Sequence, residues 1–214
     1  VAVEGEQSLA LQQWHAVYQD PYLSKLIQGA LADNLDLKAA QSRLRQAYAL
    51  IGVSRAALFP KLDAGFNADT EQKTGSHETL KTYTASGLLG WELDVWGIQR
   101  REVEAAEAQA LQAELDLNAV QVSLIGNIAV QYFTLLSIDH QLDITRSTVD
   151  TRKEALRILG LRKESGVISA IDVSQAEVSL AEAERKFPGL KQAAFEIESV
   201  LSVLLGHAPG DIDR

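Results

Sequence analysis

Along most of the chain, seam positions, which are mainly apolar, recur at alternating steps of three and four residues. The first run follows Asp20 and Pro21, which are suited to cap and open a helix. It stops before Pro60, because proline disfavours a helical conformation in the residue before it. Its seam positions are Leu37, Ala40, Leu44, Ala47, Ile51, Ser54 and Leu58. This heptad spacing predicts a helix over residues 21–59 that packs against another helix.

A second run predicts one very long helix over residues 97–164. The span lacks proline and consists mostly of strong helix formers, which gives a helix of about 100 Å. Its seam positions are Val103, Ala106, Ala110, Ala113, Leu117, Val120, Leu124, Ile128, Leu135, Ile138, Leu142, Val149, Leu156 and Leu159, with polar interruptions at Gln131, Thr145 and Arg152. The two successive steps of four around Leu124 form a stutter, which locally unwinds a left-handed supercoil.

A third run predicts a returning helix over residues 172–205. Ser169 is a suitable N-cap, and Asp172 occupies the acidic position of a capping box. Gly206 suits the C-terminal end, and Pro188 is expected to kink the helix. The seam positions are Val173, Ala176, Leu180, Ala183, Phe187, Leu190, Ala194, Ile197, Leu201 and Leu204.

Between the first two helices, residues 60–96 change to a period of two, which predicts a β-hairpin with a polar loop at about residues 71–80. Alternation continues to Val95, so the second strand is expected to end at Gly97. One face carries Leu62, Phe66, Tyr83, Leu89 and Trp91, and the other carries Asp63, Asn67, Asp69, Glu92 and Asp94. The pattern fits equally an ordinary half-buried hairpin, or a membrane barrel strand pair whose first face meets lipid and whose second lines a hydrated lumen.

The turn between the last two helices, residues 165–171, is unusually apolar. Its candidate contact residues are Ser165, Gly166, Val167, Ile168, Ser169 and the neighbouring Asp172. Two explanations stay open: the apolar side chains pack on one another to close the hairpin, or they form a docking surface for a partner.

Composition narrows the classes of function. The formal net charge of −9 argues against nucleic-acid binding, which rests on basic groups that neutralise phosphates. The chain has no cysteine, its histidines are not paired at metal-ligand spacing, and no nucleophile elbow or phosphate-binding loop occurs, so we predict no enzyme activity, cofactor or metal site. No uninterrupted apolar run approaches the length of a membrane-spanning helix.

Three stretches resemble one repeat of the outer membrane factors, the TolC-like exit ducts of multidrug and metal efflux systems. They are LADNLDLKAAQSRLRQAYALIGVSRAALFPKLDA, WELDVWG, and ESGVISAIDVSQAEVSLAEAERKFPGLKQAAFEIESVLSVLLGHAPG. Together with their order and spacing, they extend the resemblance over nearly the whole chain from about residue 20.

The resemblance implies a mainly α fold: a long coiled-coil helical hairpin plus a β-hairpin that joins a trimeric, twelve-stranded outer-membrane barrel. Residues 1–20 are then an N-terminal extension, residues 206–214 a linker to a second repeat, and this chain a fragment of a lipid-anchored protein. The implied partners are two further copies, outer-membrane lipid, a periplasmic adaptor at the tip and, through it, an inner-membrane pump. On the seams alone, the alternative is a soluble coiled-coil scaffold.

Overall fold

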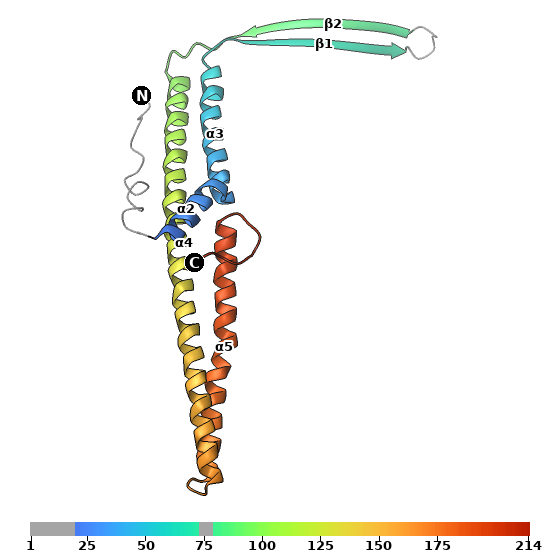
Figure 1. Ribbon diagram of the computed structural model, residues 1–214. Helices are drawn as coiled ribbons and strands as arrows, with labels where there is room; N and C mark the ends of the chain where they lie inside the picture. Colours follow the sequence, from blue (N-terminus) through green and yellow to red (C-terminus); the bar gives the residue numbers. More distant parts are fainter. Residues whose placement is uncertain (1–19, 73–78) are drawn as a thin grey trace. The chain divides into compact units, whose positions relative to one another are not determined.

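The computed structural model describes residues 20–72 and 79–214, and Figure 1 shows the order of their elements. These are helices α2 (Pro21–Asp33) and α3 (Leu35–Ala56), strands β1 (Lys61–Gln72) and β2 (Thr79–Gly90), and helices α4 (Ile98–Glu164) and α5 (Ala170–Leu204). The chain divides into two units, one formed by residues 40–117 and the other by residues 1–39 with 118–214. Except for its last residue, Asp20, the predicted N-terminal extension lies outside the described residues.

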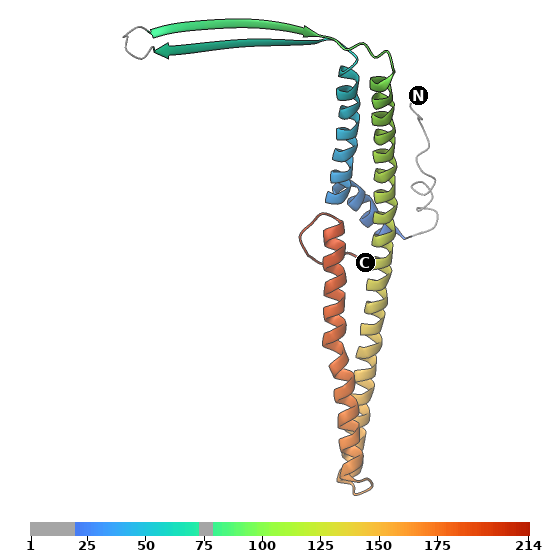
Figure 2. The ribbon, with the colours of Figure 1, turned by 180° about the vertical axis from the view of Figure 1, so that it is seen from behind.

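The second of these units is built on a helical hairpin. From residue 118 onward, α4 runs beside the antiparallel α5 (Figures 1 and 2). All the predicted seam positions here are buried or half-buried, and Ile128, Leu135 and Leu201 are fully enclosed. Each enclosed side chain contributes roughly 1.5–3 kcal/mol relative to an exposed one. The heptad prediction for both helices is therefore confirmed.

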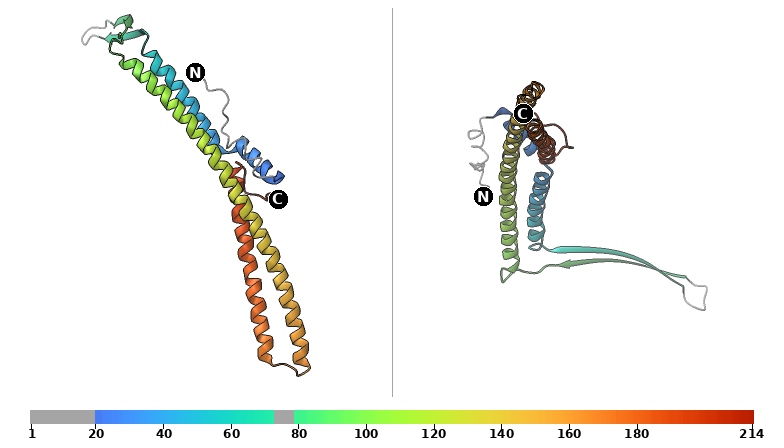
Figure 3. Two further views of the ribbon diagram at one scale, coloured as in Figure 1. Left: turned by 90° about the vertical axis from the view of Figure 1, so that its left-hand side faces the viewer. Right: turned by 90° about the horizontal axis from the view of Figure 1, so that it is seen from below.

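In the unit formed by residues 40–117, α3 from Ala40 onward packs against the first part of α4 (Figure 3). Ala40, Ala106 and Ala110 are buried in this contact, and their small side chains allow the helices to approach closely. On the rim of the contact, the Arg55 guanidinium lies 2.6 Å from the Glu107 carboxylate. The seam predicted for residues 37–58 is thus also the packing surface.

The prediction of one helix over residues 21–59 is wrong, because the chain breaks at Asn34 and α3 ends at Ala56. Asn34 has extended rather than helical backbone angles (φ −56°, ψ 130°). Its side-chain oxygen accepts a hydrogen bond from the Leu37 amide at 2.9 Å, which caps the start of α3. The break therefore follows from side-chain capping by Asn34, just before the first predicted seam position, Leu37.

The strands pair antiparallel in a single register that runs from Lys61 opposite Gly90 to Gln72 opposite Thr79. Strand β2 ends at Gly90 rather than at Gly97, so the prediction that it continues to Val95 is wrong. Gly97 instead precedes α4 with a left-handed φ of +77°. Both strands extend into the predicted loop 71–80, whose residues 73–78 lie outside the described part of the chain.

Helix α4 contains an 18-residue window with a mean hydropathy of 1.4, apolar enough by length and composition to cross a membrane. Polar residues interrupt this window, so the absence of a long uninterrupted apolar run in the sequence did not reveal it. A third of it, 33%, is buried inside the structure. A core helix has the same property, so the window alone is weak evidence of membrane spanning.

Candidate functional site

The tip of the helical hairpin is formed by two local motifs. Helix α4 ends in a Schellman motif: the Val167 amide donates to the Arg162 carbonyl at 3.0 Å, and the Gly166 amide donates to that of Lys163 at 2.9 Å. Gly166 has a φ of +74°, which a residue with a Cβ adopts at a cost. Gly166 therefore allows the chain to reverse at the end of α4.

The next helix starts one turn later with a complete capping box. The Ser169 hydroxyl accepts from the Asp172 amide at 3.4 Å, while the Asp172 carboxylate accepts from the Ser169 amide at 2.9 Å. Hydrogen bonds from the Ser169 side chain and amide lower the pKa of Asp172 below its usual value. The predicted cap is confirmed, but α5 begins at Ala170, so the turn is shorter than residues 165–171.

The apolar side chains of the tip divide into two groups. Ile168 is half-buried, whereas Val167 is 72% exposed and Ile171 is similarly open to solvent. Ile171 also borders a shallow depression on α5 formed with Ala170, Ser174, Gln175 and Val178. Because Val167 and Ile171 stay exposed, closing the hairpin does not account for them. The docking role of the tip residues remains a prediction, and the seven-residue spacing of Ile171 and Val178 was the signal that sequence reasoning missed.

A second apolar stripe, the outer stripe, runs along the helical hairpin away from the seam. On α4 it comprises Val122, Val130, Phe133, Ile144, Ile158 and Leu161, and on α5 it comprises Ile171, Val178 and Phe195; all of them are exposed. Each lies two residues after a seam position on α4 or two before one on α5. Two residues turn a helix by about 200°, so the outer stripe lies nearly opposite the seam.

The register of the β-hairpin places four of the predicted lipid-facing residues on one face. Leu62 is opposite Leu89, and the rings of Phe66 and Tyr83 stack with centroids 6.4 Å apart. These side chains are exposed, and nothing among the described residues covers them. The fifth residue, Trp91, follows the strand rather than belonging to it.

The opposite face carries Asp63, Asn67 and Asp69, as predicted for the lumen side. The Asn67 amide donates to the Asp69 carboxylate at 2.8 Å along this face. Leu88, opposite Asp63, is an apolar residue on this face. Whether this face lines a lumen remains a prediction.

Glu92 and Asp94 were also predicted for the lumen face, but both lie beyond the strand, so the alternation argument does not apply to them. The Asp94 side chain, only 11% exposed, accepts hydrogen bonds from the Gln99 and Arg100 amides at 3.3 and 3.0 Å. Partial burial raises the pKa of Asp94, but these bonds outweigh it and lower the pKa. Asp94 thus caps the start of α4, where a carboxylate is favourable.

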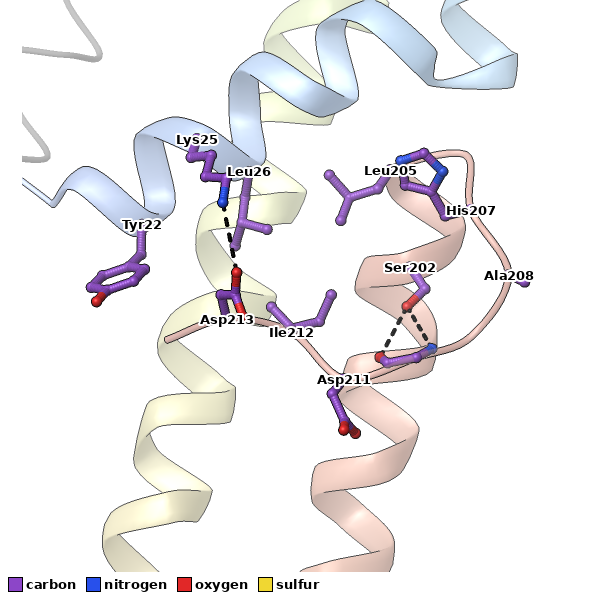
Figure 4. A pocket seen from close by; sticks show the side chains of 11 residues that line it. Tyr22, Lys25, Leu26, Ser202, Leu205, His207, Ala208, Asp211, Ile212 and Asp213 are labelled. Atoms are coloured by element: carbon purple, nitrogen blue, oxygen red, sulfur yellow. Dashed lines mark hydrogen bonds and ion pairs between the residues drawn. The ribbon is translucent and has the colours of Figure 1, made fainter.

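A pocket lies beside the end of α5 and is lined by α2 and the C-terminal segment (Figure 4). The Gly210 amide donates to the Ser202 hydroxyl at 3.3 Å, and that hydroxyl donates to the Gly210 carbonyl at 3.4 Å. The Lys25 ammonium lies 3.6 Å from the Asp213 carboxylate. The predicted linker 206–214 is therefore folded back against its own unit, and the polar groups lining the pocket hold that segment.

Comparison with known proteins places this arrangement in a family. A family model described as outer membrane efflux protein matches residues 26–207. The pyoverdine export outer membrane protein OpmQ of Pseudomonas aeruginosa is 28% identical over 207 residues, which cover 92% of this chain and 44% of that protein. The probable efflux pump outer membrane protein TtgC of Pseudomonas putida is 30% identical over 213 residues, covering 96% and 44%.

The solved structure of the outer-membrane channel OprN matches with a TM-score of 0.81 and 29% identity over 94% of this chain and 46% of that one. The chain thus spans less than half the length of the relatives it matches. Its helical hairpin and paired strands lie within the part that the comparisons cover. The chain belongs to the outer membrane efflux protein family.

Proposed function

We propose that this chain is part of the outer-membrane channel of a tripartite efflux pump and acts as a passive exit duct. In this assembly three copies surround one channel in the outer membrane, with the helices forming a periplasmic tunnel. The β-hairpin contributes to a barrel in lipid, and the helical tip meets a periplasmic adaptor that connects to an inner-membrane pump. The energy for transport comes from the pump, and the duct itself is passive.

The observation that carries this proposal is the outer stripe. A helix that packs on a single partner has a polar face opposite its seam. Here that opposite face carries exposed apolar side chains, such as Ile144 and Phe195. A helix with apolar stripes on nearly opposite sides lies between two neighbours in a single layer of helices. Such a layer, closed on itself, is a tube.

The two-stranded sheet supports the same assembly. A two-stranded hairpin is at best marginally stable in water, and this one exposes both Leu62 and Leu89 on one face. In a barrel, neighbouring strands satisfy its free edges and lipid covers this face. The soluble scaffold explains the seams but neither the outer stripe nor the exposed hairpin face.

The names of the relatives bear on the cargo. One relative is named for pyoverdine export, and others for efflux of antibiotics or toluene. This range supports a duct that does not itself select its cargo, with selection made by the pump.

The tunnel is tested by placing a charge in the outer stripe with Ile144→Asp. We expect loss of the trimer in native mass spectrometry of the detergent-solubilised protein, because the carboxylate would be buried between helices. Helix content by circular dichroism should be unchanged, since Ile144 is outside the seam. Asn127→Asp is the control, because it adds the same charge at an exposed α4 position outside both stripes. An intact Ile144→Asp trimer would contradict the tunnel.

The docking role of the tip is tested with Val167→Asp. An unpaired carboxylate in a desolvated contact should weaken cross-linking to the adaptor at least tenfold. Helix content should not change, because Val167 is exposed and its amide, which completes the cap, is retained. Asn127→Asp again serves as the control. Adaptor cross-linking at the unmutated level would refute docking at the tip while leaving the channel intact.

Channel activity is tested by the conductance of the protein in a planar lipid bilayer. Steps of current with a preference for cations are expected if Asp63 and Asp69 face the lumen. Replacing both with asparagine should reduce the cation preference without closing the channel. A protein that stays soluble without detergent and conducts no current would exclude the proposed function.

A further inference from the structure

The segment that joins β2 to α4, residues 91–98, is called here the junction segment. Five of its eight residues are large and apolar, and all five are exposed: Trp91, Leu93, Val95, Trp96 and Ile98. We propose that this segment is a membrane-binding surface that rests in the phospholipid headgroup region where the barrel strands leave the bilayer. The inference rests on the proposed function, and it assigns the role to a part of the chain that is not a strand.

The junction segment is held in one conformation by polar contacts at both ends. The Trp91 indole donates to the Leu58 carbonyl at 3.3 Å, next to the start of β1. Further along, the Arg100 guanidinium donates to the Asp94 carbonyl at 3.1 Å and to its carboxylate at 3.3 Å. The Val95 amide donates to the Leu93 carbonyl at 2.8 Å, forming a tight turn between them. The apolar side chains are therefore displayed by a braced backbone.

The chemistry of the segment fits a headgroup region better than hydrocarbon. Glu92 and the Asp94–Arg100 ion pair alternate with the apolar side chains, and burying such charges among lipid tails is costly. Trp96 is 88% exposed, and its indole N–H has no acceptor among the described residues. Tryptophan favours this zone, because its ring enters the apolar layer while its N–H meets water or headgroups.

Basic side chains lie beside the segment in the sequence and in the strand register. Lys61 is opposite Gly90, the residue before Trp91, and has no ion-pair partner among residues 20–72 and 79–214. Arg101 follows in the first turn of α4 and is largely exposed, with its guanidinium 2.5 Å from the Glu104 carboxylate. Lysine and arginine at this level can reach phosphate groups with their long side chains.

Continuity with the hairpin favours a membrane over a protein as the partner. The apolar hairpin face begins with the pair Leu62 and Leu89, one register step from Lys61 and Gly90. A bilayer that covers this pair reaches the junction segment within a few residues. The same bilayer then accounts for both exposed surfaces.

The test uses single-tryptophan proteins in vesicles of phosphatidylethanolamine and phosphatidylglycerol that contain brominated lipid. Trp14 and Trp91 are replaced by phenylalanine, so that Trp96 alone reports its depth. This removes the bond to Leu58, but the Asp94–Arg100 contacts beside Trp96 are retained. Two controls place the single tryptophan in the hairpin (Leu89→Trp) or at the tip (Val167→Trp), with all native tryptophans replaced. Emission is compared with bromine near the headgroup and near the chain end.

We expect Trp96 to be quenched at least twofold more by bromine near the headgroup than near the chain end, and the tip control not to be quenched. Leu89→Trp should be quenched by both lipids. If Leu89→Trp is quenched while Trp96 behaves like the tip control, the junction segment does not bind lipid. The proposal that the hairpin lies in the bilayer is then retained. If neither Leu89→Trp nor Trp96 is quenched, the proposed function and this inference both fail.

Discussion

Asn34 joins three helix ends, and its replacement is the sharpest test of how the helical unit is held together. Its side-chain oxygen caps α3, as described above, while its side-chain nitrogen donates to the Leu204 carbonyl at the end of α5, at 2.9 Å. Asn34 is 4% exposed, so water does not readily replace either bond. Removing the side chain therefore leaves one donor and one acceptor unsatisfied.

The magnitude of the loss follows from these two bonds. Loss of a helix N-cap costs about 1 kcal/mol, and a buried acceptor without a partner costs about 1–3 kcal/mol. Asn34→Ala should thus lower the free energy of unfolding by about 2–4 kcal/mol. Asn34→Ser keeps a capping oxygen but not the long donor to Leu204, so it should lose about 1–3 kcal/mol. The two variants separate the cap from the bridge between helices.

Urea unfolding in a fixed detergent, followed by circular dichroism, measures both changes. The slope of free energy against urea should be the same in all three proteins, so that midpoints can be compared. If Asn34→Ser is as stable as the unmutated protein, the bond to Leu204 contributes nothing. If Asn34→Ala loses less than about 0.5 kcal/mol, the cap is also unimportant and the account of the break at Asn34 is wrong.

Two further predictions concern the same unit. Gly206→Ala should lower the free energy of unfolding by at least about 1–2 kcal/mol in the same urea assay, because φ at Gly206 is +77° and a Cβ there would lie 2.5 Å from the Asp33 carbonyl oxygen. The control Gly160→Ala, at a helical position with open space around it, should be neutral or stabilising. Equal losses of stability in the two variants would count against the packing argument. Burial and the 2.9 Å bond donated to Asp20 raise the pKa of Tyr132, 2% exposed, to about 12. Since an unfolded tyrosine ionises near pH 10, this stabilisation is complete below that pH and is lost as pH rises through about 12. In Tyr132→Phe, the free energy of unfolding should fall less steeply between pH 10 and about 12 than it does in the unmutated protein. The same pH dependence in both proteins would show that Tyr132 does not contribute.

Much of the helical structure was predictable because one physical rule governs it. Burial along a helix follows the heptad spacing, so seam residues such as Leu135 and Leu201 could be identified from the sequence. The tip could be located because Gly166, Ser169 and Asp172 each have a strong local preference for their positions.

The two boundaries that were predicted wrongly, at Asn34 and Gly90, depend on hydrogen bonds of polar side chains as well as on the local sequence pattern. Asn34 lies just before the first predicted seam position, Leu37, and its side chain also reaches Leu204, which is distant in sequence. Beyond Gly90, alternation continues in sequence, but the Asp94 carboxylate binds the amides at the start of α4, and the chain leaves the sheet. In neither case does periodicity reveal which hydrogen bonds a polar side chain prefers.

The Schellman motif at Gly166 bears on the reversibility of the docking proposed for the tip. The amides of Gly166 and Val167 are already satisfied within the chain, and the capping box does the same for Ser169 and Asp172. If the proposed partner docks here, it gains nothing from these four amides, and its contact with Val167 rests on side-chain complementarity. When it leaves, the tip requires no refolding. Contacts of this kind suit repeated assembly and disassembly, in which the lifetime of the complex is set by a few exposed side chains such as Val167.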